Sequence, residues 1–132
     1  MKTNDIDINI DKKTFNDLNK CVDENGDCDF RITKKLLANM GLMFLIDELS
    51  YTEIKSQIKE YPKATDKKRI VFRLNNPKLT NQVNTIATRN EKHILFEIAL
   101  NRLFKKMELT PIHELIINYI QIGGVLWAYP LS

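Results

Sequence analysis

The side chains that could do chemistry gather in one acidic segment, residues 23–30, which reads Asp-Glu-Asn-Gly-Asp-Cys-Asp-Phe. Carboxylate and amide oxygens at alternate positions, followed by an apolar residue at the eighth, are the pattern that a calcium-binding loop presents to its cation. The apolar residue here is Phe30. The oxygen-bearing side chains at alternate positions are those of Asp23, Asn25, Asp27 and Asp29. The segment therefore predicts a turn with the layout of a calcium loop.

Two positions of this loop depart from what tight calcium binding requires. Cys28 stands at the sixth position, where glycine normally allows a sharp turn, and Lys34 stands at the twelfth, where a glutamate should close the site. A lysine donates no oxygen to a cation and adds a repelling charge beside it. We therefore expect calcium binding to be weak or lost, and no other cofactor. The alternative interpretation is an ordinary acidic turn between two helices.

No group of residues in the sequence favours catalysis. His93 and His113 lie twenty residues apart, and neither has a cysteine or aspartate at metal-ligand spacing. Cys21 and Cys28 have acidic surroundings, which disfavour the thiolate that a nucleophile requires. The Gly-Gly pair near the C-terminus has neither the preceding strand nor the following lysine of a phosphate-binding loop. We therefore expect that the protein is not an enzyme.

The elements that would position these residues are mostly helical. Apolar residues at helical spacing predict helices over residues 13–22, 32–44, 50–61, 77–88, 91–107 and 110–122. The helix over residues 91–107 is apolar on more than one side, which is typical of a central helix or of one that binds a partner.

Local signals mark the starts of several helices and the positions of short strands. Asp11 or Thr14 could cap the first helix, and Ser50 with Glu53 forms a capping-box pattern. Asn76 followed by proline is typical of a helix start. Alternating apolar residues predict a strand over residues 70–74, and a short extended segment or tail over residues 1–12. Residues 125–127 could form a further short strand.

The acidic loop and its flanking helices resemble the EF-hand of the calmodulin and myosin light chain group, in the style of the essential light chains. Residues 49–54, which read Leu-Ser-Tyr-Thr-Glu-Ile, are similar to that family's "Leu-Thr-x-x-Glu-Val" helix opening. Residues 69–72 resemble the strand that pairs with the first loop's own strand, where Phe30 would lie. Residues 124–127 resemble the strand of a fourth loop.

This resemblance implies an all-α fold of EF-hand-like helix-loop-helix pairs in two small lobes, with short β pairings between loops. Residues 1–12 would be a polar N-terminal segment, and residues 13–74 an N-terminal EF-hand-like lobe. Residues 75–132, where the resemblance is poor, would be a degenerate C-terminal lobe.

The resemblance also implies a protein that binds a partner rather than a catalyst. Lobes of this family hold an amphipathic helix, typically the IQ motif in the neck of a myosin heavy chain. A groove for such a helix is often rich in methionine and aromatic side chains. The residues that could line it here are Met40, Met43, Phe44, Phe96, Leu100, Phe104 and Met107. The alternative for each of them is a place in the hydrophobic core.

A competing hypothesis uses residues 68–104, which resemble a ribbon-helix-helix DNA-binding protein that acts as a dimer. Arg69, Val71 and Arg73 would face outward from a paired ribbon in the major groove, and Lys92 would hold phosphate. Residues 63–107 carry a net charge of +8, which suits nucleic acid. A solvent-exposed strand face is the simpler interpretation of the arginines. A small inhibitor of a larger enzyme is a third possibility that the sequence leaves open.

Composition excludes several classes of protein. The chain has 132 residues and a net charge of +3, divided into −3 over residues 1–60 and +6 over residues 61–132. Its longest apolar stretch, residues 40–46, is too short to span a bilayer, which requires about 20 residues. The first thirty residues contain no apolar block typical of a secretory signal. Two cysteines form no disulfide framework, so we expect a reduced, cytoplasmic protein.

Overall fold

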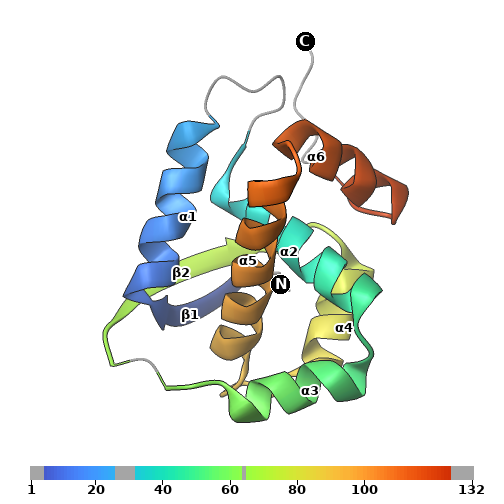
Figure 1. Cartoon of the computed structure of the whole chain (residues 1–132). Helices are drawn as coiled ribbons and strands as arrows, with labels where there is room; N and C mark the ends of the chain where they lie inside the picture. The colour runs from blue at the N-terminus through green and yellow to red at the C-terminus, as the bar shows by residue number, and fades with distance from the viewer. Residues whose placement is uncertain (1–4, 26–31, 64, 126–132) are drawn as a thin grey trace.

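Eight elements follow one another in a computed structural model of the chain, which describes residues 5–25, 32–63 and 65–125 (Figure 1). They are β1 (Asp5–Asp11), α1 (Lys12–Glu24), α2 (Lys34–Glu48), α3 (Tyr51–Glu60), β2 (Lys67–Arg73), α4 (Pro77–Ile86), α5 (Lys92–Leu109) and α6 (Ile112–Gln121). The prediction of a mostly helical chain with brief extended pieces is confirmed. All six predicted helices are present within these ranges.

Side chains cap the starts of four helices, and Thr33 does so for α2 by accepting a hydrogen bond from the Leu36 N–H. Asp11 Oδ1 accepts a hydrogen bond from the Lys13 N–H, 3.3 Å away, and so caps α1. Ser50 and Glu53 form the predicted capping box, because each side chain accepts from the other residue's backbone N–H. Asn76 caps α4, whose first residue is a proline. The caps predicted for α1, α3 and α4 are confirmed, because a cap depends only on residues within one turn of the helix start.

The strand pairing differs from the one that the EF-hand resemblance implied. β2 pairs antiparallel with β1, with Ile8 opposite Ile70. Residues 1–12, predicted as a polar segment, thus supply a strand whose apolar side chains match those of β2. Phe30, the expected partner position, lies outside the described residues. The EF-hand pairing of one loop with another is therefore not confirmed.

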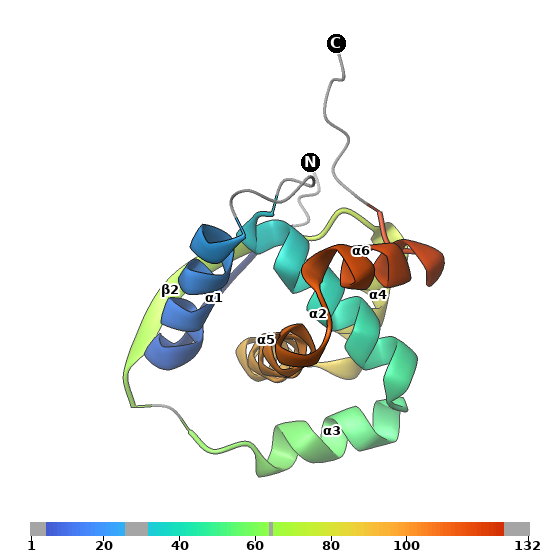
Figure 2. The same cartoon turned by 45° about the horizontal axis from the view of Figure 1, so that its top comes forward.

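α5 lies at the centre of the fold. Figure 2 shows it nearly end-on, with α1, α2 and α3 arranged around it, and β1 also packs against it. Its most extensive contact is with α2, where Gly41 lies directly against the backbone of Ala99. The Phe96 ring on α5 stacks on Phe72 of β2, with ring centroids 5.0 Å apart. One continuous core joins residues from both halves of the chain, so the predicted boundary at residue 74 is not visible as a break in it.

Two buried polar side chains tie separate segments to this core. Asn39 of α2 is fully buried and donates hydrogen bonds to the backbone oxygens of Lys35 and Arg73, at 2.8 and 3.1 Å. It thereby joins α2 to the end of β2. Buried amides whose donors are satisfied in this way make one arrangement of the segments more favourable than its competitors.

Glu97 is the buried carboxyl group of α5 and is only 1% exposed. The Tyr61 hydroxyl donates to its Oε1 over 3.1 Å, and Asn101 Nδ2 donates to the Tyr61 oxygen over 3.3 Å. Burial raises the pKa of Glu97, although hydrogen bonds from the Asp11 backbone and from Tyr61 partly offset this effect. Burial and the neighbouring Glu97 charge raise the pKa of Tyr61 to about 12. The carboxyl group therefore retains its proton to a higher pH than an exposed glutamate.

Replacing Gly41 with alanine tests the close approach of α2 and α5. A Cβ at this position would lie 2.9 Å from the Ala99 carbonyl oxygen, which is backbone and cannot rotate away. Overpacking of this kind typically costs about 1–3 kcal/mol. Alanine gains about 1 kcal/mol in helix propensity over glycine. We expect Gly41→Ala to lower the free energy of unfolding in urea. Adding Ala99→Gly should not restore it, since the clash is with the main chain. A variant as stable as wild type would contradict this packing.

The pH dependence of stability tests the environment of Glu97. Because its pKa is raised in the folded state, its contribution is greatest below the unfolded value near 4.5 and is lost as pH rises through the folded value. Unfolding titrations of Glu97→Gln should therefore show this variant gaining stability relative to wild type from pH 4 to pH 8. Glu48→Gln is the control of opposite sign. Burial tends to raise the Glu48 pKa, yet hydrogen bonds from Lys106 and Arg102 bring it below the usual value. If the free energy of unfolding changed with pH equally in Glu97→Gln and wild type, the raised pKa of Glu97 would be contradicted.

Candidate functional site

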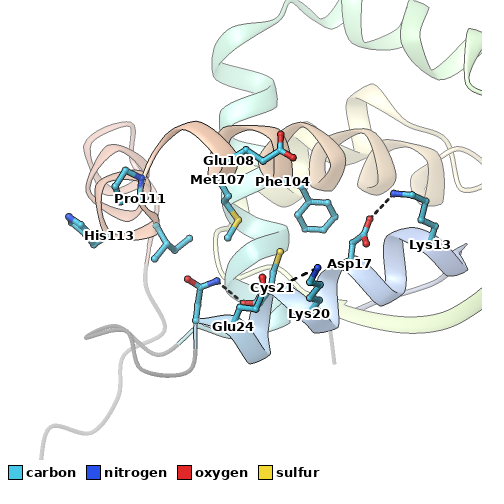
Figure 3. A pocket seen from close by; sticks show the side chains of 12 residues that line it. Lys13, Asp17, Lys20, Cys21, Glu24, Phe104, Met107, Glu108, Pro111 and His113 are labelled. Carbon is cyan, nitrogen blue, oxygen red and sulfur yellow. Dashed lines mark hydrogen bonds and ion pairs between the residues drawn. The ribbon is translucent and has the colours of Figure 1, made fainter.

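A groove of about 710 Å³ separates α1 from the corner where α5 is followed by α6 (Figure 3). Its lining residues come from α1, from the end of α5 and from the start of α6. They are Lys13, Asp17, Lys20, Cys21, Glu24, Asn25, Phe104, Met107, Glu108, Pro111, Ile112 and His113. Its volume is more than twice that of each of four other hollows on the described residues. It contains two of the residues that the sequence predicted for partner binding.

The α1 side of the groove is a row of charged residues beside an apolar stripe. Leu18 of α1 is fully buried in the core. Its burial sets the rotation of the helix, so that the charged side chains of α1 lie at the groove and in solvent. Lys13 and Asp17 form an ion pair of 3.0 Å one turn apart, and Lys20 lies 4.0 Å from Glu24 in the same arrangement. Such exposed pairs stabilise a helix only slightly, by about 0.3–0.5 kcal/mol each. Their main effect here is that this wall carries little net charge.

The opposite side of the groove is apolar at its base. Phe104 and Met107 project from the last turns of α5, and Ile112 begins α6. All three are partly buried and pack against the core. Pro111 directly precedes α6, so α5 ends before it and the chain turns. The turn places the start of α6 beside the end of α5.

Cys21 projects into this groove toward Met107 and Phe104, as Figure 3 shows. Burial raises the pKa of its thiol, and the nearby charges of Glu24 and Asp17 raise it further. A thiol with a raised pKa carries little thiolate near neutral pH and is a poor nucleophile. Cys21 therefore contributes a mostly protonated thiol to the groove.

The seven residues predicted to bind a partner helix are divided between the core and the surface. Met40, Phe44, Phe96 and Leu100 are buried and cannot touch a partner in this arrangement. Phe104 and Met107 line the groove, and Met43 lines a smaller hollow with Ile46 and Ile122. The four buried residues lie on the two central helices, α2 and α5, which are apolar on more than one side. The sequence also missed Cys21 and Ile112, which complete the base of the groove.

The acidic loop is described only at its start. Asp23 is exposed in the last turn of α1, and Asn25 ends that helix by donating from its backbone and side chain to the Cys21 oxygen. Asp27 and Asp29 lie outside the described residues. Lys34 begins α2, and its ammonium lies 5.5 Å from the centre of the Phe15 ring. In the part of the chain that the structure describes, no three carboxylate, histidine or cysteine side chains could together hold a metal ion.

The two arginines predicted to read DNA are already engaged within the chain. Arg69 binds the Asp7 carboxylate through Nε and Nη2, at 2.6 to 3.1 Å, and Arg73 binds Asp5 at 2.7 Å. Val71 between them is exposed, and Lys92 is half-buried in the first turn of α5. The strand partner of β2 is β1 of the same chain. The alternating aspartates of residues 5–11 were the signal for this pairing.

Comparison with known proteins identifies no family. No protein-family model, curated protein or solved structure matches the chain. Within the described ranges, none of the helices combines the length and apolar character needed to cross a bilayer. Any function must therefore be argued from the groove and from the charges around it.

A calcium titration tests the interpretation of the acidic loop. We expect no saturable isotherm at micromolar calcium for the wild-type chain, because Lys34 stands where a bidentate carboxylate is needed. Isothermal titration of Lys34→Glu should show a higher affinity. Lys35→Glu makes the same charge change one residue further along the chain and should leave the calcium affinity unchanged. Tight binding by the wild-type chain would contradict our interpretation of Lys34. Equal behaviour of the two variants would favour an ordinary acidic turn.

Proposed function

We propose that the chain is a non-catalytic binding protein whose groove takes an amphipathic helix of a partner protein. The observation that carries the proposal is the row of partly exposed apolar side chains, Phe104, Met107 and Ile112, at the base of a groove with charged walls. Helix-in-groove recognition requires this combination, since the partner buries its apolar face and keeps its polar face in water.

The dimensions of the groove support a helix as its occupant. α1 forms one wall over 13 residues, which is about 20 Å of helix. A partner helix of three to four turns would lie along this wall. Met107 has a flexible side chain that can adjust to different apolar anchors, and Phe104 offers a rigid ring beside it.

The charges around the groove indicate which partner helix would bind best. Lys13, Asp17, Lys20 and Glu24 are paired on α1, whereas Glu108 on the opposite wall is exposed and forms no ion pair among the described residues. A basic side chain of the partner would therefore be favoured at that wall. The resemblance to light chains suggests a helix of the kind found in a myosin neck. Calcium would not be required, because Lys34 prevents tight binding at the loop.

An affinity pull-down from the source organism tests this function. The bait is wild-type protein, Met107→Glu, Glu108→Lys or Val71→Glu, in nuclease-treated extract with either calcium or chelator. Val71→Glu is the matched control, because Val71 is an exposed apolar residue on β2, outside the groove. We expect one partner to be recovered with wild type and Val71→Glu in both conditions. Met107→Glu should reduce its recovery at least tenfold, as for a central interface residue.

The partner's helix is then tested as a synthetic peptide. Binding should slow alkylation of Cys21, which the peptide would cover, and Glu108→Lys should weaken the affinity without changing the thermal stability of the free protein. Equal binding of the peptide by wild type, Met107→Glu and Glu108→Lys would exclude the groove. A parallel pull-down from untreated extract serves as a comparison, and a partner recovered there but lost after nuclease treatment would instead support the nucleic-acid hypothesis.

A further inference from the structure

A second hollow, of about 260 Å³, lies near the N-terminal end of α5, away from the groove. Its lining residues come from β1, from the start of β2, from the segment that joins α4 to α5, and from the first turn of α5. They are Asp7, Ile8, Asn9, Lys67, Arg89, Asn90 and His93. The groove residues Phe104 and Met107 occupy the other end of α5, so the two sites share no lining residue.

Two cationic side chains, those of Lys67 and Arg89, line this hollow together with His93. Lys67, Arg89 and His93 come from three different segments and line the same space. Neither Lys67 nor Arg89 forms an ion pair with any of the described residues. Lys63 lines an adjoining cleft together with Lys67 and His93. The buried Glu97 carboxyl group lines that cleft too; burial raises its pKa, whereas the Lys67 charge acts to lower it.

The single carboxylate in the hollow does not offset these charges. Asp7 accepts three hydrogen bonds from the Arg69 guanidinium, at 2.6 to 3.1 Å, so its negative charge is already compensated. Partial burial and the nearby Lys67 charge lower the pKa of His93. The imidazole is therefore mostly neutral near pH 7, and the positive charges of the hollow are those of Lys67 and Arg89. An anion between Lys67 and Arg89 would be attracted by both charges and could accept a hydrogen bond from the neutral imidazole.

We propose that this hollow binds a phosphate group, either as inorganic phosphate or on a small phosphomonoester. Arg89 offers a planar guanidinium that can donate two parallel hydrogen bonds, and Lys67 offers a compact ammonium. Asn9, Asn90 and His93 add further potential donors to the same lining. The hollow is smaller than the roughly 300–1,000 Å³ of pockets for drug-sized ligands, which favours one phosphate group as the anchoring unit. This site is independent of the helix-binding groove.

A phosphate titration followed by amide resonances tests the site. Inorganic phosphate is added to the full chain at constant ionic strength, with chloride as the exchanged anion. We expect saturable shifts at Lys67 and over residues 89–93. Lys67→Gln and Arg89→Gln should each weaken binding about tenfold. Lys68→Gln is the matched control, because Lys68 is the next residue of β2, equally exposed, and does not line the hollow. Its affinity should stay within twofold of wild type.

Three outcomes would overturn the proposal. Shifts that chloride reproduces at equal ionic strength would show screening alone, and equal losses in Lys67→Gln and Lys68→Gln would show a diffuse charge effect. Binding of duplex DNA without any response to phosphate would show a polyelectrolyte surface. Titration with AMP distinguishes the two sources of phosphate. Tighter binding with added shifts at Ile8 and Asn9 would assign a phosphomonoester, and an affinity no greater than that of phosphate would assign the free anion.

Discussion

The close crossing of α2 and α5 is the contact on which the rest of the structure depends. Gly41 has no side chain, so the Ala99 backbone approaches to a distance at which any Cβ would clash. That approach makes α5 the central helix, with β1 on another side and Phe96 stacked against Phe72. Protein interiors are close-packed, so the position of one central helix determines where all its neighbours can lie. A larger residue in place of Gly41 or Ala99 would shift α5 and the elements packed against it.

The same crossing explains why both proposed sites lie at the ends of α5. Residues 95–100 are buried without interruption, because they lie in the middle of the helix, where α2, β1 and α3 surround it. Toward either end the burial becomes partial, at His93 on one side and at Phe104 and Met107 on the other. A side chain that the core only partly covers can contact a ligand or partner without disrupting the fold. The helix thus supplies stability from its centre and binding surfaces from its ends.

The features that could be predicted from the sequence are the local ones. Ser50 and Glu53 cap α3 through atoms within one turn, so four residues contain the whole signal. The pairing of β1 with β2 joins residues more than fifty positions apart, and many alternative partners have similar apolar patterns. The groove shows the same limit. Phe96 and Phe104 have the same chemistry and occur on one helix. Tertiary packing alone separates them, because the first stacks on Phe72 of β2 in the core and the second lies in a groove.

Charge gives the clearest case in which a sequence pattern changes its meaning once the fold is known. The acidic first half and basic second half could indicate a nucleic-acid partner, yet much of the asymmetry is satisfied inside the chain. Asp5 pairs with Arg73, Asp7 with Arg69, and Glu48 with both Arg102 and Lys106. Each exposed pair contributes little stability, but the two pairs that join β1 to β2 favour one register of these strands over its alternatives. The informative charges are therefore those left without a partner among the described residues. Lys67 and Arg89 are two of them, and they face the same hollow. A net charge read from sequence counts every cation equally, whereas recognition depends on the few whose counter-charge the fold does not provide.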